Sequence, residues 1–271
     1  MTEAVSALAG VRVLDLSRVL ADPWSTQILG DLGADVIKIE KPGAGDDTRS
    51  WGPPFVTAPD GRQGDAAYYL AANRNKRSVE IDFSQPAGAD IVRRMIPRCQ
   101  ILVENFKTGG LKKYGLDYES VASLNPSLVY CSITGFGHTG PYAKRPGYDY
   151  MIQAMGGLMS LTGEPDGEPM KSAVAVADLF TGMYAATSIL AALRHAERTG
   201  QGQQIDVSLL DCQIAMLANL GMNYLVSGQN GARLGNAHAS IAPYQVFATL
   251  DGHVVLAIGN DGQFQDFCAV A

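Results

Sequence analysis

The chain has 271 residues, and its 21 lysines and arginines against 27 aspartates and glutamates give a net charge of −6. This acidic balance argues against a protein that binds nucleic acid through a broadly basic surface. Hydrophobic residues make up 46% of the chain and charged residues 18%, a balance that excludes a disordered chain and predicts a globular protein with a sizeable core.

Six short apolar runs rich in β-branched residues predict strands, and they span residues 11–17, 35–40, 78–83, 101–106, 128–134 and 204–210. Helical spacing of apolar residues predicts helices between them, over 23–32, 85–97 and 117–124. The clearest helix, over 179–196, is apolar on several faces and is expected to be buried or to lie at a subunit interface. Because strands and helices alternate, the expected fold class is α/β, with a Rossmann-like, mainly parallel six-stranded sheet flanked by helices.

The last part of the chain predicts a change of organisation. A helix is expected over 211–227, followed by a polar, glycine-containing loop over 228–240. Two strands are then expected around an Asp251-Gly252 turn. These features predict a large α/β domain over residues 1–225 and the start of a smaller domain over residues 226–271.

Several common functional motifs do not occur in the sequence. It contains no GxGxxG, no P-loop pattern and no GxSxG, which argues against an ordinary dinucleotide site, a P-loop enzyme and a serine hydrolase. The four histidines lack metal-ligand spacing and the four cysteines form no CxxC pair, so neither a metal site nor a disulfide framework is indicated. The first ten residues, MTEAVSALAG, lack the features of a secretory signal, and no run of about eighteen apolar residues occurs, which favours a cytoplasmic protein without a membrane partner.

Basic residues gather near the ends of the predicted strands, where ligands bind in parallel sheets. Lys41 follows the second strand, Arg74, Lys76 and Arg77 lie just before the third, and Lys113 follows the fourth. In an acidic protein such clusters can hold phosphate groups. The alternative interpretation is a set of solvated surface side chains.

Asp178 lies between the apolar run AVAVA and the predicted buried helix. An aspartate at such a position commonly caps a helix by accepting backbone N–H hydrogen bonds. A helix N-terminus also keeps a carboxylate ionised, as a carboxylate nucleophile requires, so the same position suits covalent catalysis. The local sequence leaves both interpretations open.

Seven segments stand out in chain order: VLDLSRVLADP, GADVIKIEKPGAGDDTR, NRNKRS, LVENF, SITGFGHTGPYAKRPGYD, GGLMSLTG and AVADLFTGMYA. Together they resemble the family III CoA-transferases, or CaiB/BaiF group, which contains formyl-CoA transferase and α-methylacyl-CoA racemase. TRSWGPPFV, YYLAANRNKRS, YCSITGFG and GNAHASIAPYQVF are similar to the succinyl-CoA-dependent dicarboxylate CoA-transferases, such as those acting on glutarate.

The resemblance implies roles for particular residues. Asp178, in VADLFTG, matches the catalytic nucleophile of the family. The residues implied to bind CoA are Arg18, Val19, Lys41, Arg74, Asn75, Lys76, Arg77, Asn105, Phe106, Lys113 and Tyr148. The residues expected to contact the acyl group or a dicarboxylate are Arg49, Arg74, Gly156, Gly157, Asn236 and His238. The chain departs from the family at Asp22, where relatives usually carry glycine and an ionised acid would repel phosphate.

The activity that the resemblance implies is transfer of CoA from an acyl-CoA donor, with succinyl-CoA favoured, to a carboxylic or dicarboxylic acid through a covalent aspartyl intermediate. CoA is then a substrate, and no metal is implied. Racemase members carry a histidine where this chain has Tyr148, and a phenol with a reference pKa of about 10 is a poor base near neutral pH. A racemase-type isomerase is therefore the less favoured alternative.

The resemblance also implies an interlocked homodimer, in which the chain returns from the small domain to complete the large one. This chain ends within the equivalent of the small domain, so the C-terminal return segment is expected to be absent. An inactive, truncated CoA-binding fragment is a third interpretation, and it predicts binding of CoA without turnover.

Overall fold

The computed structural model describes residues 6–271, and tertiary contacts divide the chain into two compact units. The first unit comprises residues up to 152 together with 175–213, and the second comprises 153–174 and 214–271. The predicted domain boundary between residues 225 and 226 lies inside the second unit and stays a prediction. Residues 1–5, on which the expectation about a secretory signal partly rests, lie outside the described residues.

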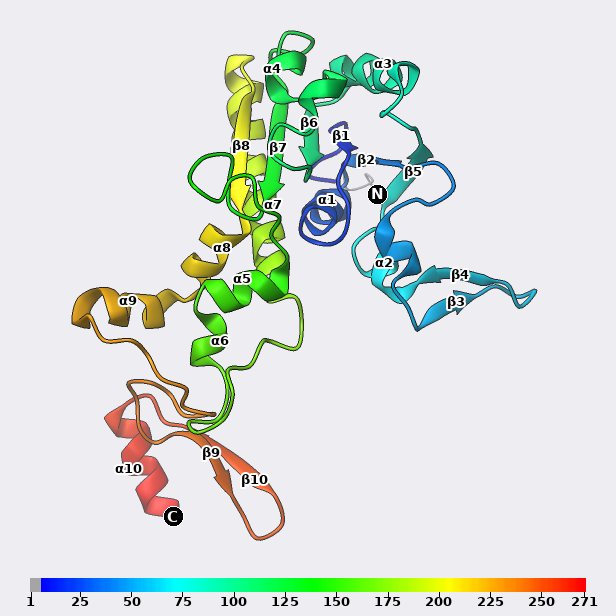
Figure 1. Cartoon of the computed structure of the whole chain (residues 1–271). Helices are drawn as coiled ribbons and strands as arrows, with labels where there is room; N and C mark the ends of the chain where they lie inside the picture. Colours follow the sequence, from blue (N-terminus) through cyan, green and yellow to red (C-terminus); the bar gives the residue numbers. More distant parts are fainter. Residues whose placement is uncertain (1–5) are drawn as a thin grey trace, which may run out of the picture. The chain divides into compact units, whose positions relative to one another are not determined.

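The first unit is built on a six-stranded sheet (Figure 1). Its strands are β1 (Arg12–Asp15), β2 (Asp35–Glu40), β5 (Lys76–Glu80), β6 (Ile101–Glu104), β7 (Val129–Thr134) and β8 (Gln203–Ser208). Neighbouring strands are parallel throughout, in the order β5-β2-β1-β6-β7-β8. This is the doubly wound order, in which the winding reverses between β1 and β6. The predicted α/β class and parallel sheet are confirmed.

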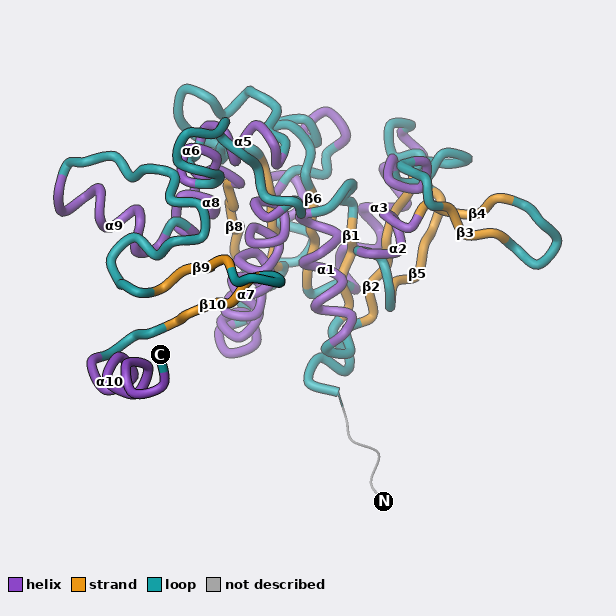
Figure 2. Tube along the Cα trace, turned by 90° about the horizontal axis from the view of Figure 1, so that it is seen from below, coloured by secondary structure: helices purple, strands orange, loops and turns teal. Residues whose placement is uncertain are grey.

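Helices cover both faces of this sheet. α1 and α7 pack against each other on one face (Figure 2), and α3 and α4 contribute to a separate core on the other. Because successive side chains of a strand alternate, Val13 joins the first core and Leu14 joins the second. Burial on both faces explains why the strand sequences are nearly continuous apolar runs. The bounds are α1 (Ala21–Asp31), α3 (Pro86–Met95), α4 (Tyr118–Val121) and α7 (Val176–Thr199).

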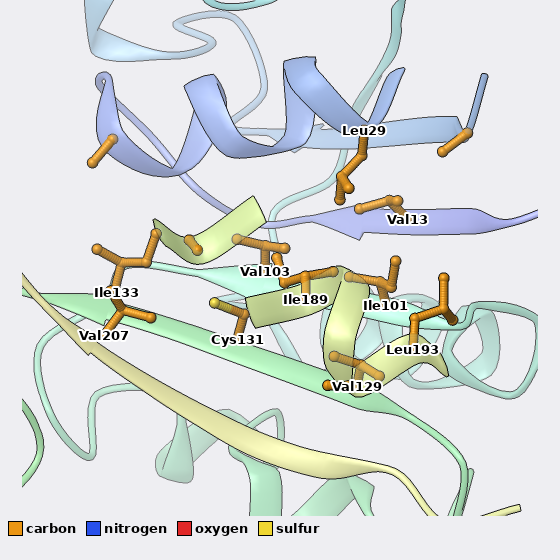
Figure 3. Close-up of a cluster of buried hydrophobic side chains, with 14 of the residues drawn as sticks. Val13, Leu29, Ile101, Val103, Val129, Cys131, Ile133, Ile189, Leu193 and Val207 are labelled. Atoms are coloured by element: carbon orange, nitrogen blue, oxygen red, sulfur yellow. The ribbon is translucent and has the colours of Figure 1, made fainter. Parts of the chain in front are cut away.

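The core beneath α1 and α7 fixes both helices on the sheet. Figure 3 shows Val13 and Val103 of the sheet near Leu29 of α1 and Ile189 of α7, and these four side chains are fully buried. Full burial of one such side chain contributes about 1.5–3 kcal/mol. Packing of α1 and α7 on this core therefore holds the first turns of both helices in place.

α7 is long and apolar enough, with a mean hydropathy of 1.5, to cross a membrane on length and composition alone. A core helix has the same properties, and α7 buries a face that runs from Ala177 to Ala196. Its contacts with α1, β7 and β8 account for that burial. The helix begins at Val176, before the predicted start at Leu179.

Some elements differ from the sequence prediction. The single helix expected over 211–227 is wrong, because the chain forms α8 (Leu209–Met216) and α9 (Ala218–Ser227) instead. Ala218 has a φ of +47°, a left-handed conformation that interrupts a helix. Short elements without a clear apolar pattern were not predicted: η1 (Asp47–Ser50), β3 (Phe55–Thr57), β4 (Gln63–Ala66), α2 (Ala67–Ala71), η2 (Ile96–Arg98) and η3 (Lys112–Tyr114).

The second unit contains the predicted hairpin. β9 (Tyr244–Ala248) and β10 (His253–Ala257) are antiparallel around the Asp251-Gly252 turn. The Asn260 side chain then caps α10 (Asp261–Val270) by accepting the Gln263 N–H at 3.0 Å. Two further short helices are α5 (Asp149–Met155), which begins in the first unit, and α6 (Leu158–Leu161).

Candidate functional site

A cavity of about 650 Å³ opens at the carboxyl ends of the parallel strands, within the first unit. Its walls include segments at or just after the ends of five strands: residues 16–22, 38–41, 81–84, 105–108 and 133–135. Residues 143–148, Leu209 and Asp178 complete much of the lining. Doubly wound sheets bind ligands at this edge, beside the reversal in strand order. The volume suits an organic ligand of the size of a cofactor.

Exposed cations surround this cavity. Arg18, Lys41, Lys107, Lys113, Lys144 and Arg145 all line it, and each has an exposed side chain. Arg18 also lies over the Phe106 ring, with the guanidinium carbon 5.3 Å from the ring centroid. Cations grouped around a cleft create a positive local potential even in a protein with a net negative charge. The cavity therefore suits a ligand that carries several phosphates.

The turn after β1 holds a strained residue against the cavity. Val19 has a φ of +73°, a conformation that is rare for a β-branched side chain. Asn105 fixes the preceding residue, because it accepts the Arg18 N–H at 3.1 Å and donates to the Arg18 carbonyl oxygen at 2.6 Å. Asp46 accepts the Val19 N–H at 3.4 Å and pairs with buried Lys38 at 2.9 Å. Such strain persists where the surroundings fix it, commonly at ligand sites.

Asp178 is the third residue of α7 and lines the cavity while only 9% exposed. Of the two interpretations that the local sequence leaves open, capping does not apply, since the N-cap residue is Ala175. Asp149 performs the capping instead, and its Oδ1 accepts the N–H groups of Ala177 at 2.8 Å and Asp178 at 3.3 Å. The Asp178 carboxyl group is thereby free of a capping role. Burial, together with the charge of Asp149, raises its pKa to about 7.

A buried ionic network lies at the end of β1. Lys76 Nζ lies 3.1 Å from Asp15 Oδ2, and both side chains are almost completely buried. Burial alone would raise the pKa of Asp15, but the charges of Lys76 and Lys38 and the hydroxyls of Ser17 and Thr26 hold it well below its usual range. Burial lowers the pKa of Lys76 to about 8. The network leaves Lys76 committed to protein partners.

The structure brings some of the sequence-predicted residues together and not others. The cavity is lined by Asp178 and by seven residues expected to bind CoA: Arg18, Val19, Lys41, Asn105, Phe106, Lys113 and Tyr148. Five other predicted residues lie outside its lining: Arg49, Arg74, Asn75, Lys76 and Arg77. Gly156, Gly157, Asn236 and His238 belong to the second unit, and their contact with the acyl group stays a prediction.

The predicted arginines outside the cavity lining are paired with acids. Arg74 and Asn75 both bind Asp31 at the end of α1. Arg77 donates to Asp35 at 2.8 Å. Through these contacts the basic segment NRNKRS links β5 to α1 and β2.

Arg49 is held more firmly. It donates to both carboxylate oxygens of Glu40, at 2.8 and 2.7 Å, and to Asp65 at 2.7 Å. Its guanidinium carbon also lies 3.8 Å from the centroid of the Tyr69 ring. Burial would raise the pKa of Glu40, but hydrogen bonds from Arg49 and Ser78 lower it to about 2.

Sequence reasoning missed two acids of the site. Asp149 follows Tyr148 in the segment RPGYD, and only the fold reveals that it caps α7. The sequence predicts that an ionised Asp22 repels phosphate but does not predict its burial, and the side chain is 1% exposed and lines the cavity. Among residues 6–271, no group of three or more His, Cys, Asp or Glu side chains is arranged to hold a metal ion.

Comparisons with known proteins agree with this geometry. The family model for CoA-transferase family III matches residues 8–271. Succinate–glutarate CoA-transferase of Agrobacterium fabrum is 60% identical, over 97% of this chain and 66% of that protein. Succinyl-CoA:glutarate CoA-transferase of Homo sapiens is 46% identical, over 98% of this chain and 59% of that protein.

A solved structure is also similar. The crystal structure of a CaiB/BaiF family protein from Brucella suis matches with a TM-score of 0.90 and 55% identity, over 98% of this chain and 70% of that one. The chain spans 66% and 59% of the length of the two curated relatives named above. Because the family model covers almost all of the residues, this chain belongs to CoA-transferase family III.

Proposed function

We propose that this protein transfers CoA from an acyl-CoA donor, with succinyl-CoA as the favoured donor, to a carboxylic or dicarboxylic acid. The observation that carries the proposal is Asp178, a buried carboxyl group without a capping role, in a cavity lined by exposed cations. The names of the Agrobacterium and human relatives, which specify glutarate, support a dicarboxylate acceptor.

The first half of the proposed reaction loads CoA onto the protein. A carboxylate oxygen of Asp178 attacks the thioester carbonyl carbon, and the C–S bond breaks as the CoA thiolate leaves with the bonding electrons. The product is a mixed anhydride of Asp178 and the donor acid. The thiolate then attacks the Asp178 carbonyl carbon, the anhydride C–O bond breaks, and succinate leaves. An aspartyl-CoA thioester remains.

The second half repeats these steps in reverse. The acceptor carboxylate attacks the aspartyl carbonyl carbon and releases the thiolate, which gives a second mixed anhydride. The thiolate attacks the acceptor carbonyl carbon, and the Asp178 carboxylate leaves with the C–O bonding electrons. No proton is gained or lost overall, so the protein has to orient the reactants, exclude water and stabilise the tetrahedral oxyanions.

The cavity residues suit these tasks. Arg18, Lys41 and Lys113 would bind the CoA phosphates, and Phe106 with Asn105 would line the thioester arm. Low exposure of Asp178 limits attack by water on its activated carbonyl group. Contacts from Gly156, Gly157, Asn236 and His238 to the acyl group remain part of the proposal.

The test is trapping of the activated aspartate. The protein is incubated with succinyl-CoA and hydroxylamine, which converts an aspartyl thioester or anhydride to a hydroxamate, and its intact mass is measured. We expect a mass increase located at Asp178, absent from Asp178→Ala and retained in Asp211→Asn, a control at an exposed acid of α8. CoA binding without any adduct would reject the transferase proposal and favour the truncated-fragment alternative.

A second assay distinguishes transfer from isomerisation. Tyr148 is 65% exposed and lines the cavity at the position where racemase members carry histidine. A transferase moves CoA between two free acids without exchange at the acyl α-carbon. Incorporation of deuterium from solvent at that carbon, with no CoA exchange, would instead support the isomerase.

We also propose a cytoplasmic homodimer. The exposed apolar side chains Leu225 and Val226, which are 73% and 81% exposed on α9, support association with a second copy. The four cysteines are free, as expected in a reducing compartment. Analytical ultracentrifugation tests the proposal, because a monomer at micromolar concentration would contradict it.

A further inference from the structure

Asp22 is an unusual group in this cavity. It belongs to the first turn of α1, is 1% exposed, and lines the same cavity as Asp178. Its Oδ1 has no hydrogen-bond partner among residues 6–271. A buried polar atom without a partner destabilises a fold, so its presence in this cavity requires an explanation.

The surroundings of Asp22 are acidic on several sides. Asp15 at the end of β1, Glu104 at the end of β6 and Asp178 on α7 each act on it electrostatically, and Cys131 of β7 lies within the same electrostatic reach. Among the described residues, no cation forms an ion pair with Asp22. An ionised Asp22 would therefore be a buried, unpaired charge surrounded by carboxylates, which is strongly unfavourable.

The nearby cations are already committed. Lys38 pairs with Asp46 and donates to the Ser17 carbonyl oxygen at 2.8 Å. Lys76 pairs with Asp15 and donates to the Pro23 carbonyl oxygen at 2.8 Å. Burial raises the pKa of Asp22 well above its usual range, and the charges of Glu104, Asp15 and Asp178 raise it further, whereas a side-chain hydrogen bond from Asn105 lowers it only in part. These influences favour the neutral, protonated form of Asp22.

Helix packing brings the two acids into one structural unit. Asp22 and Asp178 occupy the first turns of α1 and α7, which pack against each other. The approach is close enough that a Cβ atom added to Gly182 would lie 2.5 Å from the Ala21 carbonyl oxygen. Little freedom remains for one first turn to move away from the other.

We propose that Asp22 is a positioning residue for Asp178: as a neutral carboxylic acid, it turns its O–H dipole toward the ionised nucleophile and keeps that charge in place for attack. This role rests on the proposed function. It also removes the objection that an acid at position 22 repels the phosphates of CoA, because a neutral group does not.

The proposed role predicts different rates for two variants of Asp22. Asp22→Asn keeps a neutral N–H donor, whereas Asp22→Ala removes the donor. The rate of hydroxamate formation at Asp178 should fall by about 10- to 100-fold in Asp22→Ala, the value of a hydrogen bond to a charged group. Asp22→Asn should recover most of that loss, and Asp90→Asn, at an exposed acid on α3, should match the wild type.

The pH profile and an infrared spectrum provide independent readouts. Ionisation of Asp22 at alkaline pH would weaken the wild-type rate, and Asp22→Asn should lack that alkaline decline. At about pH 8, above the pKa of about 7 of Asp178 and Glu104, the wild type should still show the C=O stretching band of a protonated carboxyl group. The band should persist in Glu104→Gln and disappear in Asp22→Asn.

The outcomes separate the two proposals. An infrared band that survives Asp22→Asn, or an Asn variant as slow as the Ala variant, overturns the positioning role while the wild-type adduct still supports transfer. No adduct in the wild type overturns the transferase proposal, and the positioning role with it, even when the infrared band is present. Absence of the band from the wild type would overturn the positioning role without any substitution, so a variant that fails to fold does not remove the test.

Discussion

At the level of single residues, Asp178 experiences opposing influences. The N-terminus of α7 favours its charged form, whereas burial and the charge of Asp149 disfavour it, and the net pKa is about 7. A nucleophilic carboxylate must be ionised. We therefore expect the rate of hydroxamate formation to rise with pH through about 7 and to reach a plateau, before the decline that ionisation of Asp22 causes at alkaline pH. Initial rates from intact-mass measurements across the pH range test this.

Asp149→Asn isolates one cause of the shift. The substitution removes a negative charge but keeps an oxygen that can accept the Ala177 and Asp178 N–H groups. The inflection of the rate profile should therefore move to lower pH, because only burial then opposes ionisation of Asp178. Asp90→Asn serves as the control, and an unchanged inflection in Asp149→Asn would show that its charge does not reach the nucleophile.

The charged side chain of Arg49 stabilises the fold. Its two hydrogen bonds to Glu40, a side chain that is 2% exposed, require the planar fork of a guanidinium. Arg49→Lys should lower the free energy of unfolding by about 1–3 kcal/mol, as measured by urea denaturation at neutral pH. Arg62→Lys, in an exposed pair with Asp60, should change it little.

The stabilisation that the Arg49–Glu40 pair gives the fold depends on pH. The folded-state pKa of Glu40 is lowered to about 2, below that of the unfolded chain, so the pair stabilises the fold above the unfolded pKa and loses this effect as pH falls toward 2. The difference between wild type and Arg49→Lys should therefore shrink in acid. A difference that grows as pH falls would contradict the assignment.

At the level of elements, periodicity predicts the sheet well. DVIKIE is buried along its length between two helical layers, so its apolar run marks β2 over the same residues. QGDA in β4 has no such pattern, because that hairpin is half-exposed and held by backbone pairing. The break at Ala218 is also invisible, since a left-handed alanine is imposed by tertiary structure.

The candidate site was only partly predictable for a related reason. Arg18, Lys41 and Lys113 follow strand ends and line the cavity, as their positions in an α/β pattern indicate. Arg74 and Arg77 have equally basic surroundings in sequence, but their partners are distant in the chain. Arg18 also pairs with an acid, Asp47, at 3.1 Å, but it still lines the cavity. Which cations line the cavity therefore depends on where they and acids such as Asp31 and Asp35 fold, and local sequence does not contain that information.

The contact between α1 and α7 gives a prediction at this scale. A methyl group at Gly182 would meet the Ala21 carbonyl oxygen at 2.5 Å and the Trp24 side chain at 3.0 Å. Gly182→Ala should therefore lower the free energy of unfolding by about 1–3 kcal/mol through overpacking, despite the higher helix propensity of alanine. Met183→Ala, on the exposed side of the same helix, should cost less. Urea denaturation of both variants measures this difference. An unchanged free energy of unfolding in Gly182→Ala would contradict the prediction.

At the level of the whole molecule, the net charge and the cavity have opposite signs. The chain carries −6 overall, yet exposed cations line the cavity, while acids such as Asp15 and Asp46 are buried and paired with lysines. A polyanion approaching the protein thus encounters a local positive field on an acidic molecule. Such a field depends on solvent-exposed charges and is therefore sensitive to salt.

Binding of free CoA should reveal this arrangement. We expect the dissociation constant, measured by calorimetry, to increase with ionic strength, because the screening length falls from about 10 Å at 0.1 M salt to about 3 Å at 1 M. Lys113→Ala should weaken binding and reduce the dependence on salt, since one exposed cation is lost from the cavity. Lys171→Ala, at an exposed lysine of the second unit, is the matched control. Equal salt dependence in wild type and Lys113→Ala would mean that the phosphates of CoA bind elsewhere, and the assignment of the cavity cations would have to be abandoned even if Asp178 forms its adduct.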